Sequence, residues 1–176
     1  MRRLRYNVAM SLDGYIAGLN GEYDWIIMDP AIDFAALFAE FDTLVMGRRT
    51  FEVVRAQGPD GPESGMKVVV VSRTLRPEDY PDVKIVSDAV PEAIAALKAE
   101  PGKDIWLFGG GELFRSLLDA HLVDSIEVGV MPILLSEGIP LLLAGQASPA
   151  LRLDSSKTLP SGILMLSYTV QKRAPD

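Results

Sequence analysis

The chain has 176 residues, 48% of them hydrophobic and 23% charged, which is typical of one globular domain with a sizeable core, so we predict a single domain over residues 1–176. Its net charge of −7 argues against general nucleic-acid binding, which needs a basic face. Because the chain has no cysteine and only one histidine, His121, thiolate and multi-histidine metal sites are excluded, and we expect no metal.

The chain opens with a predicted strand followed by a long loop. Residues 4–10 alternate between apolar and polar side chains, as in a half-buried strand. The start of the chain is basic, but it has no apolar stretch of signal-peptide length and nothing approaches a membrane span, so we expect a cytoplasmic protein with no membrane partner. Residues 11–24 are rich in Gly and Asp, and Asp13 in this loop is suited to bonding turn amides.

Strands and helices then alternate along the middle of the chain. A helical pattern begins at Asp33 and includes Phe34, Leu37, Phe38 and Phe41. Further strands are predicted at 43–46, 67–71, 83–86 and 105–108, and further helices at 47–56, 89–100 and 112–120, with a loop over 58–65. The four valines at 68–71 are typical of a strand that is buried on both faces.

The carboxy-terminal part is richer in strands. Residues 124–131 and 163–170 are predicted strands without a long helix between them, and residues 138–150 are a predicted loop with a short extended piece. Together these elements predict an α/β fold with a mostly parallel central sheet and an antiparallel C-terminal edge. In such sheets ligands bind at the carboxyl ends of the strands, so the turns after residues 46, 71 and 108 should lie on one side.

Each of these three turns has residues that suit a phosphate-bearing cofactor. Gly109, Gly110 and Gly111 lead into a helix whose first residues are Glu112 and Leu113, and free N–H groups there favour an anion. Gly47, Arg48, Arg49 and Thr50 also begin a helix, and Ser72 and Arg73 follow the valine strand. Taken singly, each turn also fits a plain structural role: a tight turn, a capped helix with solvated arginines, or a surface turn.

At this point the sequence resembles a known family. The matching segments are AMSLDGYIA (9–17), VMGRRTFE (45–52), VVVVSRTL (68–75), WLFGGGELFRSLLDAHLVD (106–124), MPILLSEGIPLL (131–142) and KTLPSGILMLSYTV (157–170). In this order they resemble bacterial dihydrofolate-reductase-like proteins, the family that includes the C-terminal reductase domain of the riboflavin-biosynthesis deaminase/reductase. The resemblance implies a dihydrofolate-reductase-like three-layer fold and NADPH as the cofactor.

The resemblance also implies roles for individual residues. Ala9 and Ile16 would flank the nicotinamide, and the turn from Gly47 to Thr50 would hold the adenosine phosphates. Ser72 and Arg73 would hold the 2′-phosphate, and the three glycines would meet the pyrophosphate. In dihydrofolate reductases the first two of those glycines are joined by a cis peptide bond, so the same is expected between Gly109 and Gly110.

The substrate half is less fully specified. Asp33 falls near the helix carboxylate that binds the pterin in dihydrofolate reductases, and this resemblance makes it the candidate catalytic acid; it equally suits a helix N-cap. Asp29 and Glu40 are neighbouring candidates. Riboflavin-pathway reductases usually have a glutamate just before the glycines, where this chain has Phe108, and we expect no deaminase domain before the reductase segment.

These observations predict an NADPH-dependent reductase that transfers hydride to a small pterin-like or pyrimidine-like heterocycle. One alternative is a 5-amino-6-(5-phosphoribosylamino)uracil reductase, and another is a non-catalytic nucleotide-binding module. We expect a homodimer, as in many relatives of this type, and the apolar residues at 131–135 and 141–143 are either core or the dimer interface.

Overall fold

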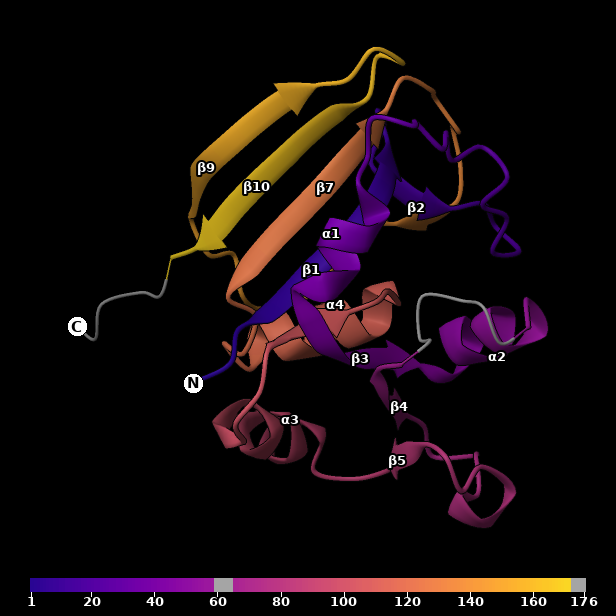
Figure 1. Ribbon diagram of the computed structural model, residues 1–176, viewed down its shortest axis with the longest axis vertical. Coiled ribbons are helices and arrows are strands. Elements are labelled where there is room, and N and C mark those ends of the chain that lie inside the picture. Colours follow the sequence, from indigo (N-terminus) through magenta and orange to yellow (C-terminus); the bar gives the residue numbers. More distant parts are fainter. Residues whose placement is uncertain (59–64, 172–176) are drawn as a thin grey trace.

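The computed structural model describes residues 1–58 and 65–171 (Figure 1). Its main sheet contains β1 (Leu4–Ser11), β3 (Phe41–Gly47), β4 (Lys67–Val71), β5 (Lys84–Val86), β6 (Asp104–Leu107), β7 (Ser125–Met131), β9 (Leu151–Thr158) and β10 (Leu164–Val170). A small second sheet contains β2 (Tyr15–Ala17) and β8 (Ile139–Pro140). The helices are α1 (Phe34–Ala39), α2 (Arg48–Ala56), α3 (Val90–Ala99) and α4 (Gly111–Asp119), with a 3-10 turn, η1, at Pro77–Asp79.

The predicted sheet is confirmed. The strand order is β5-β4-β3-β6-β1-β7-β10-β9, and all neighbours from β5 to β7 pair in parallel. The last two strands, β10 and β9, pair antiparallel and run side by side with β7 in Figure 1. The carboxyl ends of β1, β3, β4 and β6 therefore share one edge of the sheet.

Helices cover both faces of this sheet, which gives the expected three layers. On one face α3 and α4 pack with the even-numbered residues of β1, such as Leu4 and Tyr6, in the larger core cluster. On the other face α1 and α2 pack over Met46 and Trp106 in a second cluster. The valine strand β4 contributes to both clusters, since Val69 faces the first and Val70 the second, as its sequence predicts.

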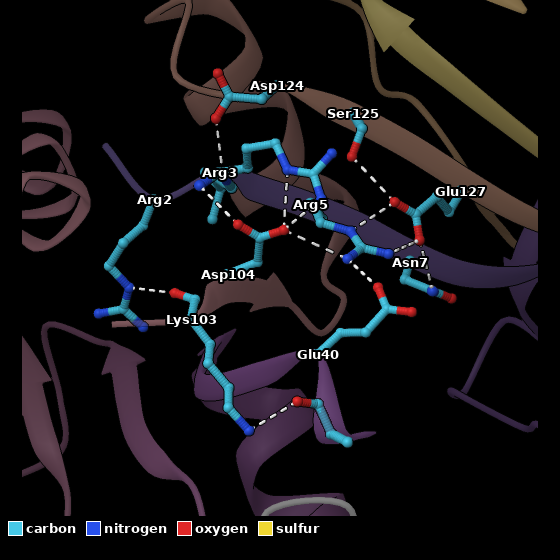
Figure 2. A network of polar contacts seen from close by, with 12 residues as sticks. Arg2, Arg3, Arg5, Asn7, Glu40, Lys103, Asp104, Asp124, Ser125 and Glu127 are labelled. Carbon is cyan, nitrogen blue, oxygen red and sulfur yellow. Dashed lines mark hydrogen bonds and ion pairs between the residues drawn. The ribbon is translucent and has the colours of Figure 1, made fainter. Parts of the chain in front are cut away.

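A buried charge network holds the end of α1 on the sheet. Figure 2 shows Arg5 of β1 between Glu127 of β7 and Glu40, which follows α1. Arg5 Nε and Nη2 each donate to one oxygen of Glu127 at 2.7 Å, and the guanidinium lies 4.6 Å from the ring centre of Phe41. The Arg5 side chain is only 8% exposed. The Arg5–Glu40 ion pair ties the C-terminal end of α1 to the sheet, while the bidentate Arg5–Glu127 pair joins β1 to β7.

Four details differ from the sequence-based prediction. The long loop after β1 contains β2, which pairs with the short extended piece β8. The first helix ends at Ala39, and Phe41 instead opens β3. The peptide bond between Gly109 and Gly110 is trans, and the positive φ angles of these glycines, 115° and 90°, form the tight turn. Strand β9 was not predicted, since LRLDSSKT has no continuous apolar alternation.

Two predictions can be compared with the structure only over the residues that it describes. Of the predicted loop over 58–65, residues 59–64 lie outside the part of the chain that the structure describes. Within residues 1–58 and 65–171, no helix has the length and apolar character needed to cross a membrane.

Acid is expected to destabilise this fold below about pH 4. The amide of Ala147 and the guanidinium of Arg115 lower the pKa of Asp119, and hydrogen bonds from Ser161 and Ala31 lower that of Asp29. A pKa that is lower in the folded state than its ordinary value of 3.8 gives stability that is complete above this value and is lost as the pH falls through the folded pKa. Urea unfolding at pH 7, 5 and 3 measures the loss.

Asp119→Asn provides the control for this pH effect. The variant should be less stable than the parent protein at pH 7 and should lose less stability between pH 5 and 3. An equal loss in both proteins would show that Asp119 does not contribute to the acid sensitivity.

Candidate functional site

The turns that follow β3, β4 and β6 lie side by side at one edge of the sheet, as predicted. Gly47 at the end of β3 pairs with Val71 at the end of β4. Val45 pairs with Leu107, and the amide of Phe108 donates to the carbonyl of Val45 at 2.9 Å. The parallel register therefore brings the glycine turn, the Gly47–Thr50 turn and the Ser72–Arg73 turn together.

The glycine turn is packed closely against two other segments. A Cβ atom on Gly109 would lie 3.7 Å from the Thr50 methyl group, in ordinary van der Waals contact. A Cβ atom on Gly111 would lie only 3.1 Å from the carbonyl oxygen of Pro140 in β8. Because Gly111 is also buried, a larger residue there would push β8 away from the start of α4.

Two helix N-termini meet at this turn. Gly47 is the N-cap of α2 and Gly110 is the N-cap of α4, and neither helix start has a side-chain capping hydrogen bond. Thr50 in the first turn of α2 lies near Gly109, within reach of a Cβ atom there, so the two helix starts are neighbours. The partial positive charge of each helix N-terminus favours an anion, and two neighbouring ones favour a multiply charged one. In the first turn of α4, Glu112 is exposed and Leu113 is packed in the core.

Arginines surround this anion-suited edge. Arg48 forms an exposed ion pair with Glu52 one helical turn later, at 2.8 Å. Arg49 and Arg73 are exposed, and their side chains make no hydrogen bond or ion pair within residues 1–58 and 65–171. Two guanidinium groups are thus available to a ligand.

Ser72 has a structural role in its turn. It is buried, and its hydroxyl accepts from the amides of Thr74 at 3.2 Å and Leu75 at 3.1 Å. The Ser72 amide donates to the carbonyl of Val86 on the neighbouring strand. These bonds fix the backbone on both sides of Arg73.

The loop after β1 closes the site on its other side. Ala9 is half-buried against the apolar cluster at the ends of β7 and β10, and Ile16 is half-buried in β2. Asp13 joins this loop to the segment before β8, because its oxygens accept from the amides of Leu135 at 3.1 Å and Ser136 at 2.7 Å. The hydroxyl of Ser11 and these amides lower the pKa of Asp13. Asp13 therefore bonds loop amides, as its sequence context indicates.

Comparison with known proteins identifies the family of this arrangement. A model of the RibD C-terminal domain matches residues 2–165. The chain belongs to the RibD C-terminal domain family. It is similar to the uncharacterized protein YyaP of Bacillus subtilis (strain 168), with 34% identity over 178 residues that cover 95% of this chain and 94% of YyaP. The family resemblance predicted from the sequence is thereby confirmed.

Solved structures agree with this assignment. A Shewanella sp. PV-4 protein, provisionally named for riboflavin biosynthesis, superposes with a TM-score of 0.83 and 30% identity, covering 98% of this chain and 100% of that one. The diaminohydroxyphosphoribosylaminopyrimidine deaminase/5-amino-6-(5-phosphoribosylamino)uracil reductase of Thermotoga maritima has a TM-score of 0.72 and 18% identity, covering 97% of this chain and 57% of that one. The second likeness shows the fold.

Within this RibD C-terminal domain fold, the carboxylates of the predicted substrate half have structural partners. Asp33 is exposed and caps α1, since its Oδ1 accepts from the Ala36 amide at 2.8 Å. Asp29 is buried, and its oxygens accept from the amides of Ala31 and Ser161. Glu40 pairs with Arg5. A catalytic role for Asp33 stays a prediction. In that role its carboxyl would also keep the hydrogen bond that caps α1.

The sequence did not predict the β2–β8 ribbon that touches Gly111. Its strands are two or three residues long, too short for a periodic signal, and the proline in β8 is typical of an edge or a loop. A cavity of about 430 Å³ lies elsewhere, beneath α2, with Met46, Val54 and Val68 among its lining residues, and none of the residues of the three turns lines it.

Proposed function

We propose that this RibD C-terminal domain protein is an NADPH-dependent reductase that transfers hydride to a C=N bond carried by a small pyrimidine-type substrate. Family membership and the reductase among its structural neighbours support a reductase. The single observation that carries the cofactor assignment is the meeting of two helix N-termini without side-chain caps, beside Arg49 and Arg73.

The residues at this edge fit a dinucleotide with several phosphates. The glycine turn offers backbone N–H groups without side chains in the way, and the α2 start offers its own N–H groups with the Thr50 hydroxyl. Arg73 projects from a turn whose backbone is fixed by Ser72, which suits the 2′-phosphate of NADPH. When bound, NADPH supplies the hydride. Ala9 and Ile16 would form the apolar walls beside the nicotinamide ring.

The names of the structural neighbours favour a pyrimidine over a pterin. One neighbour is named a 5-amino-6-(5-phosphoribosylamino)uracil reductase, and another, from Corynebacterium diphtheriae, is named pyrimidine reductase-like. Phe108 packs edge-on against Trp106 with ring centres 5.0 Å apart, next to the glycine turn, which provides an aromatic surface for a flat ring. Asp33 would help to protonate the substrate nitrogen.

Loss of NADPH absorbance in the presence of candidate substrates tests this function. We expect oxidation with 5-amino-6-ribosylaminouracil compounds and none with dihydrofolate. Asp33→Asn should slow turnover if Asp33 supplies the proton. Oxidation with dihydrofolate alone would contradict the pyrimidine assignment, and NADPH binding without oxidation by any substrate would instead indicate a nucleotide-binding module.

We also propose that the protein is a homodimer. All eight residues of β9 are exposed, and one face that β9 shares with β10 is largely apolar, with Ser156 and Thr158 as its polar members. Leu151, Leu153 and Leu164 on this face are 42%, 52% and 37% exposed, and Leu153 lies opposite Tyr168. An apolar sheet face of this kind is typical of a protein interface. Of the apolar segments first considered, Met131 is core, whereas Leu134 and Leu142 are exposed.

Leu153→Glu is expected to convert the dimer into a monomer, because a buried carboxylate without a partner opposes association. Light scattering after size-exclusion chromatography measures the mass. Ser155→Glu is the matched control, since Ser155 is exposed on the opposite face of the same strand, where it pairs with Ser167. A monomeric parent protein, or a dimer that survives Leu153→Glu, would contradict this interface.

A further inference from the structure

The segment between β1 and α1 packs beside Ala9, the residue proposed to lie next to the nicotinamide. Trp25, Ile26 and Ile32 of this segment pack with Ala9 against the apolar cluster at the ends of β7 and β10. Asp29 fixes the segment further, because it accepts from the amide of Ser161 just before β10. The segment therefore lies across the strand ends beside the position proposed for the nicotinamide.

This side of the molecule is strongly acidic. Residues 6–39, from β1 through α1, contain five carboxylates and no Lys, Arg or His, which gives a net charge of −5. Glu40 and Asp42 follow at the opposite end of β3, where they pair with Arg5 and Arg2. Most of the net charge of −7 thus lies in the part of the chain that leads to the substrate side.

Apart from Lys157 of β9, the neighbouring cations are already engaged or lie on the cofactor side. Arg5 beneath α1 is buried, and its donors bond Glu127, Glu40 and Asp104. Lys157 of β9 is near enough to Asp29 to lower the pKa of that carboxyl. Arg48, Arg49 and Arg73 lie at the turns after β3 and β4, beyond the glycine turn.

The same segment also exposes large apolar side chains. Leu12 is 66% exposed, Leu19 61%, Tyr23 46%, Ile27 38% and Met28 68%. A surface that is both acidic and apolar attracts an uncharged or cationic apolar molecule and repels an anion, since an uncompensated like charge disfavours binding.

We propose that the substrate is an uncharged or cationic heterocycle without a phosphate group, bound between the acidic, apolar segment and the nicotinamide position. This inference rests on the proposed reductase function, and it narrows the substrate class. The proposed substrate differs from the one in the name of the Thermotoga maritima neighbour, because that compound has a phosphoribosyl group. The protein would recognise the ring of this substrate by apolar contacts rather than by binding a phosphate.

The matched pair of substrates that tests this inference is 5-amino-6-(5-phosphoribosylamino)uracil and its dephosphorylated form. The two differ only in the phosphate. NADPH oxidation gives kcat/KM for each, and calorimetry with saturating NADP⁺ gives the Kd for each while the arginine-lined edge is occupied. We expect the dephosphorylated compound to be preferred by at least about tenfold in both measurements.

The outcomes separate the two proposals. Turnover that favours the phosphorylated compound would confirm the reductase and overturn the inference. Binding that favours the dephosphorylated compound without turnover of either would support the inference and count against the reductase. Binding of neither compound, or tighter binding of the phosphorylated one, would overturn the inference whatever the turnover.

A charge-reversal pair sharpens the test. Asp24 is exposed in the acidic segment next to Trp25, and Asp24→Arg should raise kcat/KM for the phosphorylated compound by about fivefold or more, with little change for the dephosphorylated one. Glu92→Arg makes the same charge change on α3, which packs on the opposite face of the sheet. It should leave the ratio of kcat/KM for the phosphorylated compound to that for the dephosphorylated compound unchanged. Equal effects of the two variants would mean that net charge, not the segment, sets the preference.

Discussion

Replacing Arg5 with Met is expected to lower the free energy of unfolding by about 3–5 kcal/mol. Arg5 is buried between Glu127 and Glu40, and its removal would leave the poorly solvated Glu127 carboxylate without its cation (Figure 2). Burial lowers the pKa of Arg5, but hydrogen bonds to Glu127 and Glu40 raise it by more, so its pKa lies above the ordinary value. The guanidinium is therefore charged at every pH at which the protein folds.

Chemical denaturation at pH 7 measures the loss of stability in Arg5→Met, and two further variants serve as comparisons. Arg3→Met also removes an arginine that pairs with Asp104, but its side chain is 60% exposed, so we expect a loss of at most about 1 kcal/mol. The double variant Arg5→Met, Glu127→Met removes both charges and should recover part of the lost stability. A loss below about 1 kcal/mol for Arg5→Met alone would show that the network does not hold α1 to the sheet.

The double variant Arg49→Ala, Arg73→Ala should bind NADPH about 30-fold or more weakly than the parent protein. Both guanidinium groups are exposed and without partners in the described residues, so each is available for a charge-assisted bond to phosphate. The affinity for NADH should fall less, because NADH has no 2′-phosphate for Arg73. Calorimetric titration of both nucleotides gives the comparison.

Lys84→Ala is the matched control for this loss of positive charge. Lys84 is exposed in β5, at the opposite end of its strand from the three turns, and we expect less than a twofold change in NADPH affinity. Equal weakening in Lys84→Ala would mean that overall charge accounts for the binding. Unchanged affinity in the double variant would remove the two arginines from the cofactor site.

Much of the fold follows from local patterns in the sequence. The alternation in β1 and the valines of β4 predict strands that the structure contains, and the glycines after β6 predict the turn into α4. Strand β9 lacks such a signal, because all of its residues are exposed and it is held by main-chain pairing with β10. Its existence depends on a neighbour rather than on its own side chains.

The candidate site was predictable on the cofactor side but only in part on the substrate side. Parallel pairing brings consecutive strand ends together, so the three turns could be placed at one edge from their order alone. The Arg5–Glu127 pair could not, because the two residues are far apart in the chain and meet through the register of β1 and β7. For Asp33 the sequence left two roles open, and the structure shows the capping bond.

The most direct test of the proposed cofactor site is a parallel titration of the protein with NADPH and NADH. Quenching of Trp25 and Trp106 fluorescence, checked by calorimetry, reports binding. We predict saturable NADPH binding with a preference over NADH of at least about tenfold, which corresponds to about 1.4 kcal/mol. Binding of neither nucleotide, or equal affinity for the two, would contradict the phosphate site formed by the glycine turn and the arginines.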